Sequence, residues 1–346
     1  DDELNELCSR FDIPPGTKER ELARRLFEKH PLIFSLNPKT PETANLPPHR
    51  IDEREGARPA HTNMYHTNPA KREALREIVR DYRAAGIVRP SVSEYTSPML
   101  MVKKADGTWR YVVDYRKLNA NTIPDKFPLP RMDDILDSMG GAEWFSTMDL
   151  ATGFLQIPML EEHKHKTAFA HPDGVDEFNV MPMGLTNASS TFQRAMQLVL
   201  AGLTWQVVLC FIDDVMVYTK TFEKHIEVLD EVFSRMEKYG LTLKRSKCQF
   251  FRREIIFLGH KISADGVAPW EKHQMAINNY PAPSTREEIW RFRGMVNYYS
   301  RFIPHFSVLC APLNRLCQSE VVFEWNEEAN NAFLALKQAI ISAPVL

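Results

Sequence analysis

The spacing of apolar residues predicts helices toward both ends of the chain and strands in its middle. Residues 18–29 and 69–85 repeat apolar positions at helical intervals, and Gly86 stands where the second helix needs a C-terminal cap. Ser284 and Thr285 can cap a third helix, in which apolar side chains again recur at helical spacing. Further helices are predicted over residues 132–139, 188–201 and 221–239.

Strand patterns fill the segments between these helices. Residues 99–103 and 109–114 flank the turn at residues 105–107, where Asp-Gly is a strong hairpin signal. Residues 143–150 form another strand, which ends near Asp149. Strands and helices follow each other without an internal repeat, so the pattern predicts an α+β fold with a helical C-terminal part.

Two adjacent carboxylates, Asp213 and Asp214, interrupt an almost entirely apolar segment. The β-branched and aromatic residues on both sides predict two buried strands, with the acids at or near a hairpin turn. Two ionised carboxylates buried there would cost several kcal/mol each without a cation to balance them. The alternative is an exposed Asp-Asp turn, although no Gly, Asn or Pro stands beside the acids. The segment favours a metal site over that alternative.

Composition narrows the class of protein without identifying it. The 346 residues can form two or three subdomains, and the net charge of −2 gives no overall signature of nucleic-acid binding. Five cysteines without a C-x-x-C pair indicate free thiols in a reducing compartment rather than a zinc module. We expect a soluble protein, because no apolar run reaches about 18 residues. Both ends look cut, since the chain begins with Asp1 rather than Met and stops at Leu346 without a terminal signal.

A third acid, Asp149, closes its own apolar strand. A strand-terminal Asp is more often a helix cap, so this signal is weak alone. Two acidic strand ends in one sheet, however, can converge on two Mg²⁺ ions about 3.5–4 Å apart, an arrangement used in nucleotidyl transfer. Mg²⁺ prefers one or two carboxylates together with phosphates and water, which suits three aspartates and a nucleoside triphosphate.

An ordered set of motifs resembles the reverse transcriptase of Ty3/gypsy-type LTR retrotransposon polyproteins and their retroviral relatives. The blocks are residues 114–119 (DYRKLN), 127–131 (FPLPR), 148–158 (MDLATGFLQIP), 183–193 (MGLTNASSTFQ), 211–214 (FIDD), 257–260 (FLGH), 297–303 (NYYSRFI) and parts of 323–337. No single block is decisive, but together they span about residues 70 to 346 in the order of the family.

The resemblance implies a right-hand polymerase with fingers, palm and thumb, in which an antiparallel palm sheet packs on helices. The implied division is an N-terminal extension at 1–45, fingers at 46–123 and 157–187, palm at 124–156 and 188–264, and a helical thumb at 265–346. A ribonuclease H domain and a connection domain are not recognisable in the sequence. We therefore expect the polymerase portion of a longer polyprotein.

Matching positions carry the family's expected roles to individual residues. Asp149, Asp213 and Asp214 match the catalytic, metal-binding acids. Five further residues match the nucleotide site: Lys103 and Arg110 as triphosphate contacts, Phe154 as the aromatic gate against a ribose 2′-hydroxyl, and Met183 and Gly184 as the pocket lining. Without the flanking motifs, the two basic residues would be interpreted as solvated charges on a hairpin, and Phe154 as a core aromatic.

Residues expected near nucleic acid are Arg116, Asn119, Phe211, Ile212, Leu258 and Gly259, the last two as the primer grip. The basic stretch 244–253 and Arg286, Arg293 and Arg301 could follow phosphates or could be solvated faces of their elements. Phe211 departs from the family, which usually has Tyr before the acid pair; this change leaves the metal ligands in place.

The resulting hypothesis is an RNA-directed DNA polymerase that extends a primer with dNTPs on an RNA or DNA template by two-metal nucleotidyl transfer. The implied cofactor is Mg²⁺, two ions, for which Mn²⁺ can substitute. The partners are the RNA template and the DNA primer–template duplex, with homo- or heterodimerisation left open and no membrane. The expected location is the cytoplasm, in a virus-like particle. One alternative is a catalytically silent nucleic-acid-binding subunit; another is an RNA-synthesising polymerase, which Phe154 disfavours.

Overall fold

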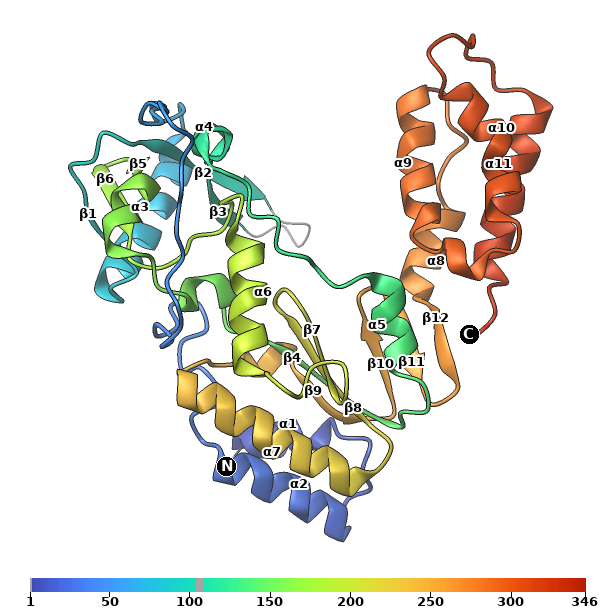
Figure 1. Ribbon diagram of the computed structural model, residues 1–346, viewed down its shortest axis with the longest axis horizontal. Helices are drawn as coiled ribbons and strands as arrows, with labels where there is room; N and C mark the ends of the chain where they lie inside the picture. The colour runs from blue at the N-terminus through green and yellow to red at the C-terminus, as the bar shows by residue number, and fades with distance from the viewer. Residues whose placement is uncertain (1, 104–108) are drawn as a thin grey trace. The chain divides into compact units, whose positions relative to one another are not determined.

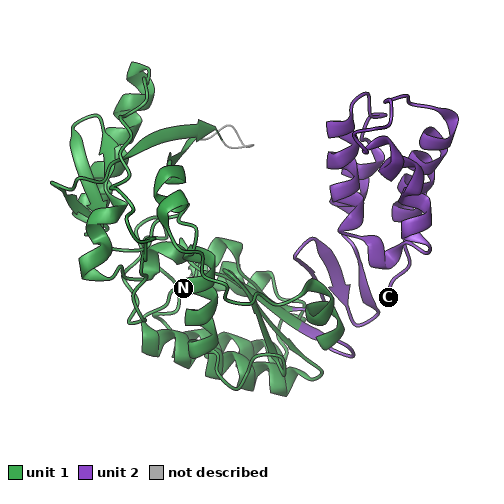
Figure 2. Cartoon of the chain, turned by 45° about the horizontal axis from the view of Figure 1, so that its top comes forward, with its two compact units in different colours: residues 1–138, 145–251 green, residues 139–144, 252–346 purple. Residues whose placement is uncertain are grey.

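A computed structural model describes residues 2–103 and 109–346, which divide into two compact units. Unit 1 consists of residues 1–138 and 145–251, and unit 2 of residues 139–144 and 252–346 (Figure 2). The Asp-Gly turn predicted at residues 105–107 lies outside the described residues. Within the described ranges, every helix is too short or too polar to cross a bilayer.

One part of unit 1 is built on a five-stranded sheet with the strand order β1-β6-β5-β2-β3 (Figure 1). Its strands are β1 Val88–Pro90, β2 Ser97–Lys103, β3 Trp109–Val113, β5 Phe169–His171 and β6 Gly174–Phe178. Helix α3 (Pro69–Ala84) packs on this sheet, and the short α4 (Arg116–Asn121) follows β3. A partly buried ion pair joins helix and sheet, because Arg83 donates two hydrogen bonds of 2.6 Å to the fully buried Asp176.

The second part of unit 1 carries a four-stranded sheet with the order β7-β8-β4-β9. Its strands are β4 Trp144–Asp149, β7 Val208–Phe211, β8 Asp214–Thr219 and β9 Gln249–Arg252. Helix α6 (Ala188–Val199) packs on β7, and α7 (Phe222–Tyr239) packs on β8 and on α2 (Lys18–Lys29), as Figure 1 shows. The remaining elements are α1 Asp2–Ser9, α5 Met132–Ser138, and the 3₁₀ helices η1 Gly153–Gln156, η2 Glu161–Thr167 and η3 Arg245–Lys247.

A buried imidazole joins this sheet to helix α7. His225 lies 2.7 Å from Ser146 Oγ through Nε2 and 2.9 Å from Thr219 Oγ1 through Nδ1. Ser146 Oγ accepts the amide of Phe251, and Thr219 Oγ1 donates to the carbonyl of Thr221. Because the Thr219 hydroxyl gives its proton to Thr221, Nδ1 of His225 must donate to Thr219. Burial lowers the pKa of His225 to about 3 and so keeps the ring neutral.

Unit 2 combines a three-stranded antiparallel sheet with four α-helices. The strands are β10 Glu254–Phe257, β11 His260–Ser263 and β12 Gly266–Pro269. The helices are α8 Glu271–Asn278, α9 Arg286–Asn297, α10 Phe306–Leu316 and α11 Glu327–Ile341, with the 3₁₀ helix η4 at Ser300–Phe302. The predicted apolar stripe is fully buried here, consisting of Ile289, Phe292, Val296, Tyr299 and Phe302.

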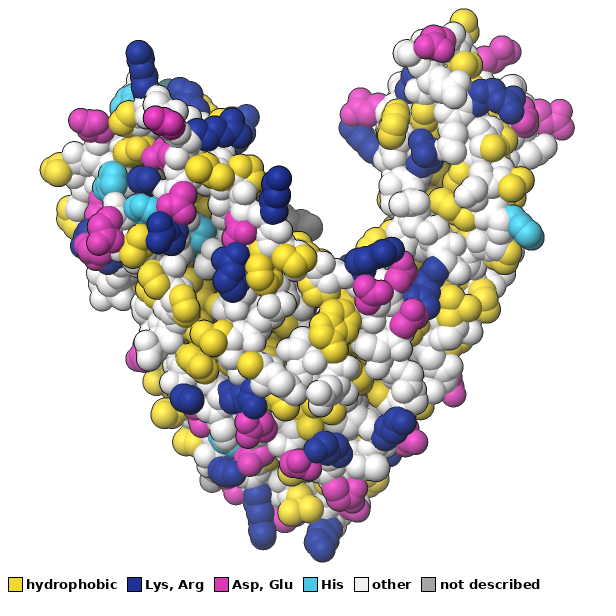
Figure 3. Space-filling view, in the orientation of Figure 1, with side chains coloured by type: hydrophobic (Ala, Val, Ile, Leu, Met, Phe, Trp, Pro, Cys, Tyr) yellow, Lys and Arg dark blue, Asp and Glu magenta, His cyan; other side chains and the backbone are white. Residues whose placement is uncertain are grey.

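The local signals in the sequence agree with these elements. Gly86 has φ +71° directly after α3, as its capping position requires. Thr285 caps α9 by accepting the amide of Glu288, whose carboxylate accepts the amide of Ser284 in return. All five cysteines are free thiols, as predicted. Figure 3 shows positive and negative side chains interspersed over the visible surface of unit 1, which agrees with the small net charge.

Candidate active site

Strands β7 and β8 form a hairpin whose tight turn carries the adjacent acids. Phe211 is paired with Asp214, so Ile212 and Asp213 occupy the two turn positions. Ile212 has φ +56°, a conformation that costs a β-branched residue roughly 1–3 kcal/mol. A glycine could adopt this φ without the cost, but the sequence has Ile here. The strained turn sets the direction in which Asp213 and Asp214 point.

Gln193 of α6 stabilises this strained turn through two hydrogen bonds to its backbone. The side chain is fully buried; its Nε2 donates to the Cys210 carbonyl at 3.0 Å, and its Oε1 accepts the Ile212 amide at 2.7 Å. One side chain thereby satisfies a backbone acceptor and a backbone donor at the start of the turn. The position of Asp213 and Asp214 therefore depends on a residue of a neighbouring helix.

Asp149 ends β4, the strand that lies next to β8 in the sheet. Its backbone is fixed by the segment before β9, because its carbonyl accepts the amide of Lys244 at 2.9 Å and its amide lies 3.4 Å from the sulfur of Cys248. Its carboxylate accepts a hydrogen bond of 3.2 Å from Lys247 Nζ. A lysine thus provides a positive charge beside the first acid.

The pKa of Asp214 shows that the acids of the two strands lie close enough to interact. The pKa of Asp214 is raised to about 6 by loss of hydration, by the negative charge of Asp213 and by that of Asp149, while Lys247 lowers it. Asp214 is exposed as a residue, and the repulsion from its two like-charged neighbours is what a bound cation would offset. A site that raises the pKa of its own carboxyl in this way favours a bound cation.

The structure corrects one expectation about these acids. Asp213 and Asp214 are exposed rather than buried, because both lie at the turn, where the apolar flanks no longer cover them. Within residues 2–103 and 109–346, no group of three His, Cys, Asp or Glu side chains is already gathered around an ion position. The residues still fit Mg²⁺, which binds through one or two carboxylates and completes its shell with substrate phosphates and water.

The predicted pocket lining, Met183 and Gly184, lies in the loop before α6. Gly184 has φ +95°, and a Cβ atom there would lie 3.5 Å from the Val113 carbonyl, so glycine suits the position. Asn119 fixes the loop by donating to the Gly184 carbonyl and accepting the amide of Thr186, both at 2.9 Å. Asn119, predicted near nucleic acid, therefore also shapes the pocket backbone.

The basic pair Lys103 and Arg110 lies at the described ends of β2 and β3, and both side chains are exposed. Lys103 is paired with Trp109, and Arg110 with Val102. Because neighbouring strand positions alternate between faces, this register directs Lys103 and Arg110 to opposite faces of the hairpin. The structure does not bring these two predicted triphosphate contacts onto one surface.

Phe154 lies in η1, just after Asp149, and is half-buried. Its ring makes an edge contact with Phe192 of α6, with 5.5 Å between centroids. Gly153 allows this approach, since a Cβ there would lie 3.1 Å from the Phe192 ring. Packing therefore holds the ring of Phe154 while part of it stays accessible. This position is compatible with both predicted roles, the gate and the core aromatic.

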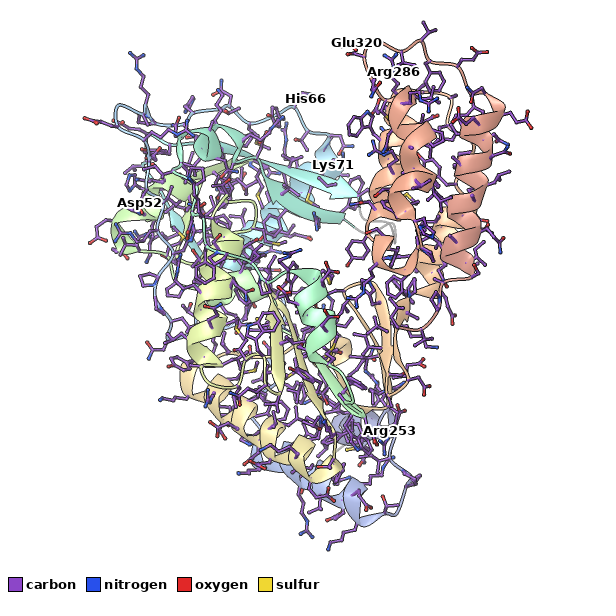
Figure 4. The ribbon with its side chains drawn as sticks, turned by 45° about the vertical axis from the view of Figure 1, so that its right-hand side comes forward. Asp52, His66, Lys71, Arg253, Arg286 and Glu320 are labelled. Carbon is purple, nitrogen blue, oxygen red and sulfur yellow. The ribbon has the colours of Figure 1, made fainter. Side chains whose placement is uncertain are left out.

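Many of the basic residues considered for phosphate contact are bound to groups of the chain itself. Arg116 makes two hydrogen bonds to Asp114, which hold the pKa of that carboxyl well below its usual range. Arg253, which is labelled in Figure 4, contacts Glu143 at 3.0 Å and stacks on Trp144. Other cations of the 244–253 stretch are also paired: Arg245 with Glu3, and Lys247 with Asp149.

The arginines expected on the thumb differ in what they contact. Arg286, labelled in Figure 4 beside the loop that carries Glu320, donates to the carbonyls of Leu316 and Val321 and so ties this loop to α9. Arg293 stacks on the exposed Trp290. Arg286 thus donates its hydrogen bonds to backbone carbonyls of unit 2 rather than to a phosphate.

The remaining predicted nucleic-acid contacts lie at two hairpin turns. Phe211 and Ile212 precede the acids in unit 1 and are half-buried. Leu258 and Gly259 form the turn between β10 and β11 in unit 2, where both have positive φ, +46° and +72°. Two turns that carry predicted functional residues thus share a strained backbone.

Three residues build this site in ways that the sequence did not reveal: Gln193 and Gln156 were given no role, and Lys247 was considered only as part of the basic stretch 244–253. Gln156 is fully buried, donates to the carbonyls of Ala151 and Thr242, and accepts the Thr242 amide. A glutamine among apolar positions was the available signal for Gln156 and Gln193. The pairing of Lys247 with Asp149 left no signal, since the two residues are 98 positions apart in the chain.

Comparison with known proteins agrees with this geometry. The profile of the family described as "Reverse transcriptase (RNA-dependent DNA polymerase)" matches residues 102–262. The chain is 36% identical over 320 residues to the "Retrovirus-related Pol polyprotein from transposon 412" of Drosophila melanogaster, covering 91% of this chain and 26% of that protein. It is 32% identical over 282 residues to the "Transposon Tf2-3 polyprotein" of Schizosaccharomyces pombe, covering 82% and 21%. The chain thus spans about a quarter of the length of these curated relatives.

Solved structures show the fold. The foamy viral protease-reverse transcriptase dRH, solved in complex with double-stranded DNA, matches with a TM-score of 0.90 and 24% identity over 100% of this chain and 60% of that one. The same viral protein in complex with an RNA/DNA hybrid matches with a TM-score of 0.86, 24% identity, and coverage of 100% and 46%. The predicted right-hand polymerase fold is therefore confirmed.

Proposed function

Because residues 102–262 carry a reverse transcriptase domain, and its relatives are Pol polyproteins of Ty3/gypsy-type retrotransposons, we propose that this chain is an RNA-directed DNA polymerase. It extends a primer with deoxynucleotides on an RNA or DNA template by two-metal nucleotidyl transfer. The observation that carries the proposal is the convergence of Asp149 and Asp214 from neighbouring strands, where the charge of Asp149 opposes ionisation of Asp214.

Asp149, Asp213 and Asp214 would hold the divalent ions, Mg²⁺ in our proposal. Such ions, when bound, lower the pKa of a primer 3′-hydroxyl and neutralise the charge of the leaving pyrophosphate. The chain's own residues supply position: Gln193 fixes the hairpin turn, and the segment before β9 fixes the backbone of Asp149. Preorganised charge of this kind is a large part of catalysis in many enzymes.

Three residues would select and orient the nucleotide. Gly184 leaves room for close approach of the backbone, and Asn119 holds the loop in place. Phe154, fixed against Phe192, would exclude a ribose 2′-hydroxyl and so favour deoxynucleotides. The RNA template and the DNA primer–template duplex are the proposed partners, and the structural relatives solved with double-stranded DNA and an RNA/DNA hybrid support this proposal.

The test is extension of oligo(dT) on poly(rA) with Mg²⁺ and, separately, with Mn²⁺. The intact chain should incorporate dTTP, and Asp213→Asn should lower the rate by at least about 10³-fold, because a neutral amide binds a divalent ion poorly. Asp265→Asn is the matched control, since Asp265 also lies at an exposed hairpin turn, between β11 and β12.

Two outcomes would contradict the proposal. Template binding without incorporation in either metal would favour the catalytically silent subunit. Incorporation that survives Asp213→Asn would show that the acids at this turn are not the metal ligands.

A further inference from the structure

The β10–β11 turn in unit 2 is held by residues in and beside α8 and directly after α9, two helices that follow it in the chain. Leu258 and Gly259, the turn residues, both have positive φ, and Leu258 has no glycine-like freedom to adopt it. A turn of this kind persists only where its surroundings stabilise it. The question is which groups do so.

The carbonyls of the turn accept hydrogen bonds from Trp270, directly before α8, and from Tyr298 and Tyr299, directly after α9. Tyr299 donates its hydroxyl proton to the Gly259 carbonyl at 2.7 Å, and the amide of Trp270 donates to the same oxygen at 3.2 Å. The Leu258 carbonyl accepts the hydroxyl of Tyr298 at 2.5 Å. Both peptide groups are thus fixed from outside the hairpin.

A histidine supports the central hydroxyl. His273 Nδ1 lies 2.6 Å from the Tyr299 hydroxyl oxygen. Since that hydroxyl gives its only proton to Gly259, His273 must donate to it, so the chain of hydrogen bonds runs from His273 through Tyr299 to Gly259. Tyr299 is almost completely buried, and burial raises its pKa, so the hydroxyl stays protonated.

The same groups pack closely against Gly259, so a side chain at this position would meet them. A Cβ atom at Gly259 would lie 3.1 Å from His273 Cε1 and 3.3 Å from the Tyr299 hydroxyl. The ring of Tyr299 also contacts His260, the residue after the turn, with 5.3 Å between centroids. Contacts and hydrogen bonds together fix one conformation of the backbone.

We propose that Tyr299, supported by His273, is a positioning residue that sets the conformation of the Leu258–Gly259 turn and thereby aims the primer 3′ end. This inference rests on the proposed function, in which the turn is the primer grip. It adds that the conformation of the grip depends on His273 of α8 and on Tyr299 directly after α9, and not on the hairpin alone. Tyr299 does not touch the reacting groups and acts only through the turn.

The test compares Tyr299→Phe with Tyr280→Phe. Tyr280 is a matched control because its hydroxyl donates to the Glu288 carbonyl at 3.0 Å, inside the same unit but away from the turn. Both variants keep the ring and lose one hydroxyl. Tyr299→Phe should lower the single-turnover rate of incorporation about tenfold, the size of one lost hydrogen bond, and leave the Kd for primer–template within about twofold. Tyr280→Phe should change neither quantity.

Amide hydrogen exchange gives a second measurement that needs no activity. Exchange of the amides in residues 257–260 should accelerate about tenfold in Tyr299→Phe and stay unchanged in Tyr280→Phe. His273→Gln should give the same acceleration, and the double variant should add little to it.

The outcomes separate the two proposals. An active chain whose incorporation rate and exchange are unaffected by Tyr299→Phe would overturn the positioning role and leave the polymerase function standing. Equal losses in Tyr299→Phe and Tyr280→Phe, or a loss that lies entirely in primer–template affinity, would also overturn it. A wild-type chain that incorporates nothing in either metal would overturn the polymerase function and the aiming of a primer, while exchange would still decide whether Tyr299 holds the turn.

Discussion

Strands β4 and β8 have two chemically different ends. At one end, Ser146 and Thr219 share their hydrogen bonds with the buried His225, and every polar group there has a partner. At the other end, the negative charges of Asp213 and Asp149 help to raise the pKa of Asp214. The first end is built for stability and the second for a ligand, although both belong to the same two strands.

The comparison of the two ends indicates which groups keep the sheet rigid. A site with unbalanced like charges destabilises the fold, so its geometry has to be held by groups that are fully satisfied elsewhere. The network around His225 and the glutamine behind the turn meet that need, because both join a strand to a helix. Changes at the two ends should therefore separate activity from stability.

The largest effect is expected for Asp214→Asn. Removing one of the like charges should lower incorporation by at least about 10³-fold, through loss of a metal ligand, while leaving the melting temperature equal or slightly higher. Primer extension and thermal unfolding of the same preparation check both parts. A variant that loses activity only because it unfolds would show that the two ends are not separate.

A smaller effect is expected from acid pH at the opposite end. The pKa of His225 is lowered from 6.5 to about 3, so only the unfolded chain takes up its proton between these values. The stabilisation is therefore complete above pH 6.5 and is lost as pH falls toward 3, at no more than about 1.4 kcal/mol per pH unit from this group.

Urea unfolding between pH 7 and pH 5 measures this loss, with His225→Gln as the comparison. The variant lacks the titrating ring but keeps an amide donor and acceptor, so the free energy of unfolding should depend less on pH than in the wild type. Equal pH dependence in both proteins would assign the acid sensitivity to other groups, such as His49, whose pKa burial lowers to about 4.

The smallest effect is expected for Lys247→Ala. The pair with Asp149 is partly exposed, so its loss should change the free energy of unfolding by less than about 1 kcal/mol. Because a positive charge is removed beside the acids, the Mg²⁺ concentration for half-maximal incorporation should fall about two- to threefold. An increase in that concentration would mean that Lys247 assists rather than opposes cation binding.

The sequence alone determined the elements and the approximate position of the site. Periodicity and caps depend on neighbours within a few residues, so the helix at 18–29, the cap at Gly86 and the β7–β8 hairpin could all be predicted locally. The placement of the acid pair at that hairpin was likewise visible, because two apolar strands must turn between them.

Tertiary structure decided how these elements are held and charged. That Asp213 and Asp214 are exposed, that Gln193 fixes their turn and that Lys247 pairs with Asp149 all depend on side chains brought together from distant parts of the chain. Such contacts leave no period in the sequence, since each involves a single side chain and a single distant partner. Charge balance and strain at a site are properties of that three-dimensional arrangement, and only the folded chain defines them.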